Sequence, residues 1–134
     1  MTIQVTRRAA MRTALLAASA GGVAIAGIAP AVAQTRSGRL RGRAGHTATG
    51  SVTLKRSGGA WTVSFSGDFK VDRAPDPVVA FGSPSRYAAS TVFSAMKASG
   101  AQSFRVPGKI DPARYSAVWV WCRRFNVPLA VASL

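Results

Sequence analysis

The sequence is short of the side chains that most catalytic sites use. It holds one cysteine, one histidine, no glutamate and only four aspartates among 134 residues. A single cysteine excludes an internal disulfide, a Cys-x-x-Cys exchange motif and covalent attachment of a c-type haem. Paired-carboxylate hydrolysis and a calcium loop are not indicated, because the aspartates lie in turn contexts without the required spacing. His46 stands alone at the domain margin, where it is a poor general base.

The chain also lacks a long uninterrupted apolar segment. The first 33 residues combine a basic start with an Ala- and Gly-rich run over about residues 13–29, which glycines interrupt. Such a run does not favour a permanent transmembrane helix, and the small residues up to Ala33 form a signal-peptide cleavage site. We therefore expect residues 1–33 to be a signal helix that is cleaved after Ala33. The mature protein would then be exported to the periplasm or beyond the cell.

The basic start resembles a twin-arginine export signal. Thr6 precedes the pair Arg7 and Arg8, and an apolar pair and Arg12 follow. Ala10 stands where phenylalanine is usual, so a general secretory signal remains open as the alternative. The twin-arginine route can carry a folded protein with its cofactor inserted, and it carries cofactor-free proteins as well.

Negative charge is scarce throughout. The formal net charge of +14 falls to +11 when the three arginines of residues 1–33 are removed. A domain of that charge is drawn to anionic lipid surfaces, acidic envelope polymers or nucleic acid, of which nucleic acid is the least expected after export. General basicity without one partner is the alternative. Residues 34–45 hold four arginines and three glycines without apolar periodicity, which predicts a flexible basic linker or a membrane-surface tether.

Short alternating runs follow the arginine-rich segment. Val52 and Leu54 alternate with polar neighbours, as do the apolar residues of segment 61–65. The pair Gly58 and Gly59 lies between the two runs. Two period-two runs about a Gly-Gly turn predict a β-hairpin.

The middle of the chain contains further strand and turn signals. Residues 78–81 and 102–106 are predicted strands, and Asp111 is expected to cap one helical turn. Residues 82–100 fit a helix face or a short strand equally well. Six to eight short strands with little helix predict an all-β fold, a small antiparallel β-sandwich over residues 46–134.

The closing residues 116–134 contain two of the three tryptophans and the only cysteine. Residues 118–122 are apolar on both faces, which predicts a strand covered on both sides. Pro128 cannot donate a ladder hydrogen bond, so the last strand is expected to be an edge or to carry a bulge. Simple alternation places one set of residues on a common face of that strand: Phe125, Val127, Leu129 and Val131.

Several segments together resemble a known family, the DM-thirteen domain. They are residues 46–52, Asp68-Phe69 with Pro75-Asp76, residues 100–104, and above all residues 118–122 with Phe125. The DM-thirteen domain is a small exported β-sandwich module, often joined in animals to DOMON domains and proposed to take part in electron transfer. The resemblance covers about residues 44–134. It implies a short strand and turn, rather than a helix, at residues 91–99.

By this resemblance Cys122 is implied to be a redox thiol or a ligand to a group such as haem. The residues themselves leave open a structural buried thiol and an intermolecular bridge as well. The positive charge of Arg124 favours the thiolate, whereas burial disfavours it, and the sequence does not decide between them. His46 is a candidate axial ligand if the opening strand passes the closing one. Haem and the absence of any prosthetic group both stay open.

Trp119 and Trp121 are expected to pack in the core, with an electron relay or a stacking platform as the alternative. The sequence thus predicts an exported electron-transfer module that uses Cys122 and a redox partner protein. The rival hypothesis is a non-redox envelope binding or structural module that its positive charge attracts to polyanions. Neither hypothesis makes the chain an enzyme on its own.

Overall fold

A computed structural model describes residues 34–134. The predicted signal helix, the pair Arg7 and Arg8 and the cleavage site after Ala33 lie outside the described residues. Within residues 34–134, no helix has the length and hydropathy that crossing a membrane requires. The elements in order are β1 (Gln34–Gly42), β2 (Ala48–Thr49), β3 (Ser51–Ser57), β4 (Ala60–Phe65), β5 (Lys70–Val71), β6 (Pro77–Ser83), β7 (Arg86–Ala88), the 3-10 turn η1 (Ala89–Thr91), β8 (Ser94–Ala95), β9 (Gln102–Arg105), the 3-10 turn η2 (Pro112–Arg114), β10 (Ala117–Cys122) and β11 (Val127–Ser133).

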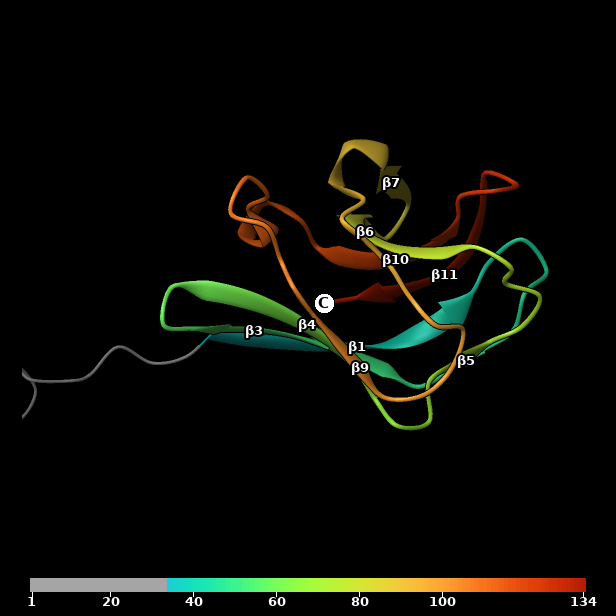
Figure 1. Cartoon of the computed structure of the whole chain (residues 1–134), viewed down its shortest axis with the longest axis horizontal. Helices are drawn as coiled ribbons and strands as arrows, with labels where there is room; N and C mark the ends of the chain where they lie inside the picture. The colour runs from blue at the N-terminus through green and yellow to red at the C-terminus, as the bar shows by residue number, and fades with distance from the viewer. Residues whose placement is uncertain (1–33) are drawn as a thin grey trace, which may run out of the picture. The chain divides into compact units, whose positions relative to one another are not determined.

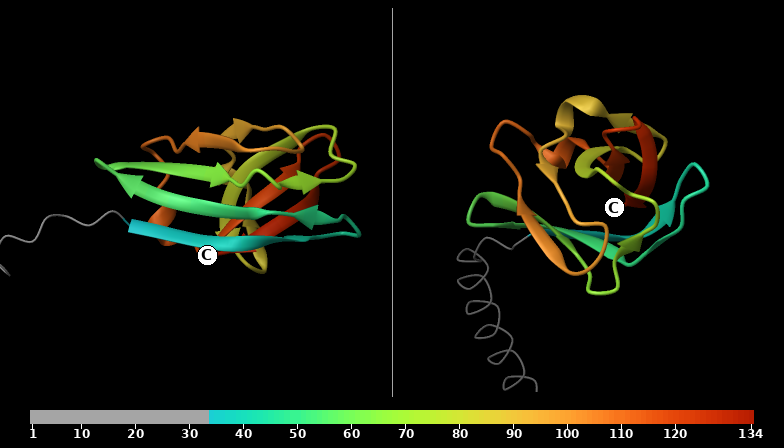
Figure 2. Two further views of the ribbon diagram at one scale, coloured as in Figure 1. Left: turned by 90° about the horizontal axis from the view of Figure 1, so that it is seen from below. Right: turned by 45° about the vertical axis from the view of Figure 1, so that its right-hand side comes forward.

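The strands form one curled antiparallel sheet in the order β7-β6-β10-β11-β1-β3-β4-β9, with β8 paired to β6. Figure 1 shows β1, β3, β4 and β9 on one side of the fold, and β6, β10 and β11 facing them on the other. The curl is clearest in the two turned views of Figure 2. A separate short pair joins β2 to β5. The predicted all-β antiparallel class is confirmed, with more strands than the expected six to eight because several are only two or three residues long.

The arginine-rich segment is a strand and not a flexible linker, so the predicted linker over residues 34–45 is wrong. The first part of β1 pairs with β3, and Leu40–Gly42 pair with β11. The side chains on the inner face of β1 are Arg36, Gly38, Leu40 and Gly42, as their register with Val52 and Leu54 requires. Two glycines and an arginine on that face remove the apolar period by which a strand is recognised. The folded domain therefore includes β1 and does not start only at residue 46.

Gly38 lies where β1 passes from one layer to the other. A Cβ atom at this position would fall well inside van der Waals contact with the backbone carbonyl of Ser133. Only a residue without a side chain lets β1 and the end of β11 approach this closely.

The interior between the layers is filled by apolar side chains from both. The predicted hairpin is β3–β4, and it contributes Val52 and Leu54, which pair with Phe65 and Val63. The opposite layer contributes Val118, Val120, Cys122 and Leu129 among others, all fully buried. A smaller cluster lies on the other face of β10, where Trp119 packs with Ala117 and Val131. Strand β10 is thus covered on both faces, as its sequence predicts.

The predicted common face of the last strand is correct only in part. Val120 pairs with Ala130 and Trp121 with Pro128, so Leu129 is an extra residue in β11. The expected bulge near Pro128 is present, and β11 lies inside the sheet between β10 and β1 rather than at its edge.

The bulge reverses the alternation beyond it. Val127 and Leu129 face the interior core, but Val131 faces the outer cluster with Trp119. Phe125 lies in the preceding turn with 63% of its surface exposed. Alternation alone could not show this reversal, because an extra residue leaves no mark on the sequence pattern.

The two local expectations for the middle of the chain are confirmed. Residues 91–99 contain the end of η1 and the short strand β8 rather than a helix. Asp111 caps η2, its carboxylate accepting a hydrogen bond from the Ala113 N–H at 3.1 Å.

Replacing Gly38 by alanine is expected to lower the free energy of unfolding by about 1–3 kcal/mol, because the new methyl group forces β1 away from Ser133. Urea denaturation followed by tryptophan fluorescence measures the change. Gly108→Ala is the control, since its Cβ would meet no atom within 4 Å. Equal stability of the two variants would show that β1 does not need this close approach.

Candidate functional site

Cys122 is the last residue of β10, directly before the turn formed by residues 123–126. Its thiol is free and its side chain is fully buried in the interior core. The turn beside it is exposed along its whole length. The sulfur therefore lies just inside a closed core, next to a solvent-exposed end of a hairpin.

The strands on both sides of this end are poor hydrogen-bond donors. Cys122 is opposite Pro77 on β6, and the neighbouring Trp121 is opposite Pro128 on β11. A proline has no N–H group, so each adjoining strand lacks one donor at this corner of the sheet. Fewer backbone hydrogen bonds hold this end than the middle of β10.

Side-chain contacts hold the turn in place instead. The guanidinium of Arg123 donates two hydrogen bonds of 3.2 Å to the Asp76 carboxylate, and its backbone N–H donates to the Asp76 carbonyl. Trp121 Nε1 donates to Asn126 Oδ1 at 3.1 Å, and Asn126 has the left-handed φ of 54°. Arg124, whose charge was expected to favour the Cys122 thiolate, does not continue the strand of Cys122, because β10 ends at Cys122 and Arg124 lies in the turn.

His46 lies in the turn after β1 and is bound to another residue. Its Nδ1 atom is 3.3 Å from the Asp72 carboxylate and 3.1 Å from the Asp72 carbonyl oxygen. The Asp72 carboxylate also accepts a hydrogen bond of 2.9 Å from the Thr47 backbone N–H. The ring of His46 thus helps to join the β1–β2 turn to the residues after β5.

A haem held between Cys122 and His46 does not fit this arrangement. Cys122 is sealed among core side chains and lies outside three pockets of residues 34–134. The bonds of His46 to Asp72 are made by Nδ1 and do not themselves prevent ligation by Nε2, so the misfit rests on the sealed sulfur. Residues 34–134 also contain no cluster of three His, Cys, Asp or Glu side chains that could hold a metal ion. The two residues named as ligands are not brought together as a ligand pair.

The aromatic residues on the outer face of β10 form a stack. Tyr87 and Trp121 lie parallel, with ring centroids 3.8 Å apart, and both meet Trp119 edge-on at 6.3 Å. Arg43 lies over the Trp119 ring at 5.4 Å, and the Trp119 indole N–H donates to the Ser83 carbonyl. Burial raises the pKa of Tyr87 above its ordinary 10.0, so the phenol stays neutral. The expected core packing is found for Trp119, whereas Trp121 is only partly buried and stacks on Tyr87 at the outer face.

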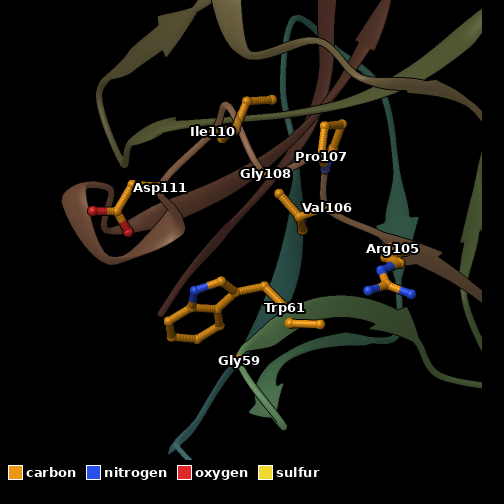
Figure 3. A pocket seen from close by; sticks show the side chains of 9 residues that line it. Gly59, Trp61, Arg105, Val106, Pro107, Gly108, Ile110 and Asp111 are labelled. Atoms are coloured by element: carbon orange, nitrogen blue, oxygen red, sulfur yellow. The ribbon is translucent and has the colours of Figure 1, made fainter.

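Sequence reasoning missed a groove around the third tryptophan. Trp61 is the second residue of β4 and lines two pockets, of about 260 and 450 Å³. Figure 3 shows its indole at one side of the smaller pocket, with the loop of Pro107, Gly108 and Ile110 across from it. The sequence places Trp61 in a hairpin, but it gives no sign that residues after β9 lie beside the ring.

A comparison with protein-family models matches residues 40–134 to the model described as Electron transfer DM13. The chain belongs to the DM13 family. The match covers most of the chain and begins within β1, so the DM13 domain includes the final strands and Cys122. Neither the curated proteins nor the solved structures contained a match to the chain. The predicted membership of the DM-thirteen family is confirmed.

The ion-pair cluster at His46 gives the DM13 domain a pH-dependent contribution to its stability. The hydrogen bond from the Thr47 N–H contributes most to holding the pKa of Asp72 below its ordinary 3.8, and Arg73 and His46 lower it further. Burial of the carboxylate opposes them by raising the pKa. A lowered carboxyl pKa stabilises the fold above the ordinary value, and this contribution is lost as pH falls through the lowered pKa.

Asp72→Asn is therefore expected to be less stable than the native sequence near neutral pH. The difference should shrink as the pH falls below 3.8, because the native carboxylate then becomes protonated as well. Urea denaturation of both proteins over a pH series measures the gap. A gap that stays constant down to about pH 2 would assign the effect to the lost side-chain packing instead.

Proposed function

We propose that this DM13 domain is exported and transfers electrons outside the cytoplasm, with Cys122 as its redox-active sulfur. The family match supports the electron-transfer role. The position of Cys122 at the end of β10, beside an exposed turn, is the observation that carries the choice of residue. The buried thiol becomes reactive when the end of the β10–β11 hairpin opens.

The chemistry proposed is thiol–disulfide exchange with a redox partner protein. The Cys122 thiol loses its proton to solvent, and the thiolate attacks one sulfur of a partner disulfide. A mixed disulfide forms, and the second partner sulfur leaves as a thiolate. One thiol of a separate dithiol donor then attacks the partner sulfur and releases Cys122 as its thiolate. The second donor thiol closes the donor disulfide and releases the remaining partner thiolate, so two electrons pass from the donor to the partner. The only co-reactants required are a partner disulfide and a donor dithiol, and no prosthetic group takes part.

Local opening is supported by the interactions at this corner. Pro77 and Pro128 each remove a backbone donor beside the end of β10. The turn is held by the Arg123–Asp76 ion pair, by the Arg123 N–H bond to the Asp76 carbonyl and by the Trp121–Asn126 bond. An exposed ion pair contributes about 0.2–1 kcal/mol. Regions with few protected hydrogen bonds open at a lower free energy than the whole domain unfolds.

Alkylation of native protein with a neutral maleimide tests this proposal. The rate of Cys122 alkylation is expected to rise only slightly with urea concentration, because local opening of the hairpin end exposes little surface. Arg123→Gln should raise the reaction rate about two- to fivefold by removing the ion pair. Arg124→Gln changes the same charge in the same turn and should leave the rate unaltered.

The urea dependence separates local opening from unfolding of the whole domain. If Cys122 reacts only with the full urea dependence of global unfolding, it is a core residue and the thiol mechanism fails. Cys122→Ser should abolish all labelling, which verifies that the signal reports this sulfur.

A second candidate function is a non-redox envelope module that binds polyanions. It is favoured by the complete burial of Cys122 and by the charge balance, since the whole chain has 18 Lys and Arg residues and only four acidic residues. Anionic lipid surfaces and acidic envelope polymers are the partners proposed.

Binding to vesicles of anionic lipid, or to polygalacturonate, is expected to weaken steeply between about 0.1 and 1 M salt. The Debye length falls over this range from about 10 Å to about 3 Å, which screens attraction between exposed charges. Titration calorimetry at several salt concentrations measures the change. Cys122→Ser should bind as the native protein does if this second function is the true one.

A further inference from the structure

The groove around Trp61 has features that the electron-transfer proposal does not use. The two pockets that Trp61 lines lie at the turn end of the β3–β4 hairpin, where Trp61 is opposite Arg56. The smaller pocket is completed by Arg105 at the end of β9 and by the loop that follows it. The larger pocket is completed by the start of β1 and by Ala113 of η2. Segments far apart in the sequence thus meet at one indole ring.

Trp61 differs from the other two tryptophans in its hydrogen bonding. The indole N–H of Trp119 donates to Ser83, and that of Trp121 donates to Asn126. Within residues 34–134 the Trp61 indole N–H has no protein acceptor, although the ring is partly buried against the core. A donor that remains open to solvent beside two pockets is available to a bound molecule.

Positive charge surrounds the ring. The Arg56 guanidinium carbon lies 5.7 Å from the ring centroid, and Arg105 and Arg36 line the two pockets. Arg36 donates to the carbonyls of Tyr115 and Pro112, which fixes its guanidinium at the pocket wall.

Among residues 34–134 the three ion pairs use only the carboxylates of Asp72 and Asp76. Arg56 and Arg105 therefore have no carboxylate partner among these residues. The one acidic residue of the groove is Asp111, and its carboxylate accepts the capping bond from Ala113. The groove therefore carries a net positive charge.

This combination identifies a class of ligand. An indole ring offers an apolar surface, its N–H donates to a hydroxyl oxygen, and guanidinium groups bind carboxylate or phosphate oxygens. A sugar that carries an anionic group presents all three complementary features: a face of C–H groups, hydroxyl oxygens and a negative charge. Pockets of about 260 and 450 Å³ are open grooves on the scale of single sugar rings, which suits a short saccharide chain passing Trp61.

We propose that the groove at Trp61 binds an acidic saccharide, with the sugar ring against the indole and its anionic group on Arg105. This inference deepens the polyanion-binding function proposed above by giving it one site and a ligand chemistry. It does not depend on Cys122. The shared ligand chemistry is an anion borne on a sugar, whether carboxylate or phosphate.

Titration of ¹⁵N-labelled mature protein by nuclear magnetic resonance tests the proposal. The probes are tetragalacturonate for the carboxylate, maltose phosphate for the phosphate, and maltotetraose as the neutral control. At least one anionic probe should shift the Trp61 indole signal and the amide signals of Val106 and Gly108, with a Kd on the order of 1 mM. Maltotetraose should bind at least about tenfold more weakly, because it cannot pair with Arg105.

Two variants test the site without relying on one of them to fold. Arg105→Gln changes an exposed residue and should raise the Kd about tenfold. Trp61→Phe keeps an aromatic ring in the hairpin but removes the N–H, and should also weaken binding, as followed by the Val106 amide. Arg86→Gln, on the other layer, removes the same charge and should leave the Kd unchanged.

The possible outcomes separate this site from general attraction to polyanions. Shifts spread over the basic surface, with equal effects of Arg105→Gln and Arg86→Gln, would retain polyanion binding and overturn the Trp61 site. No binding of any anionic probe at low salt would overturn both. Binding of adenosine monophosphate at Trp61, when ribose 5-phosphate and every acidic sugar fail to bind, would overturn the saccharide class, because the base and not the sugar would then be recognised.

Discussion

The pairing of β1 with two different strands is the constraint on which the rest of the structure depends. Its first part completes the β3–β4–β9 layer, and its end completes the β11–β10–β6 layer. The two layers can share one strand only because Gly38 lets the backbone pass close to Ser133. Since β11 is fixed by β1 and β10 is fixed by β11, this one strand sets the position of Cys122.

The two proposed functional regions lie at opposite ends of β1. The end of the β3–β4 hairpin that holds Trp61 lies beside the start of β1, because Arg56 is opposite both Gln34 and Trp61. Cys122 and its turn lie beyond the other end, where Gly42 is opposite Ala130. A redox partner at the turn of residues 123–126 and a saccharide at the Trp61 groove would therefore not compete for the same surface.

Cys122, the proposed redox residue, is also one of the most deeply buried residues of the described chain. Cys122 belongs to the interior core cluster that includes Val120 and Leu129, while the exposed groups nearby are those of the turn. Packing that seals a thiol protects it from solvent oxidants and leaves its reactivity to the motion of the hairpin end. Two prolines and one ion pair, rather than the core, would then control the chemistry.

The sequence by itself determined the all-β class, the β3–β4 hairpin, the Asp111 cap and the family, because each depends on neighbouring residues or on a continuous pattern. Only the tertiary structure decided that residues 34–42 form a strand, since glycines and Arg36 on the inner face hide its period. The same is true of the reversal of Val131, which one extra residue in β11 produces. It also holds for the groove at Trp61, because that groove is built from segments that only folding brings together.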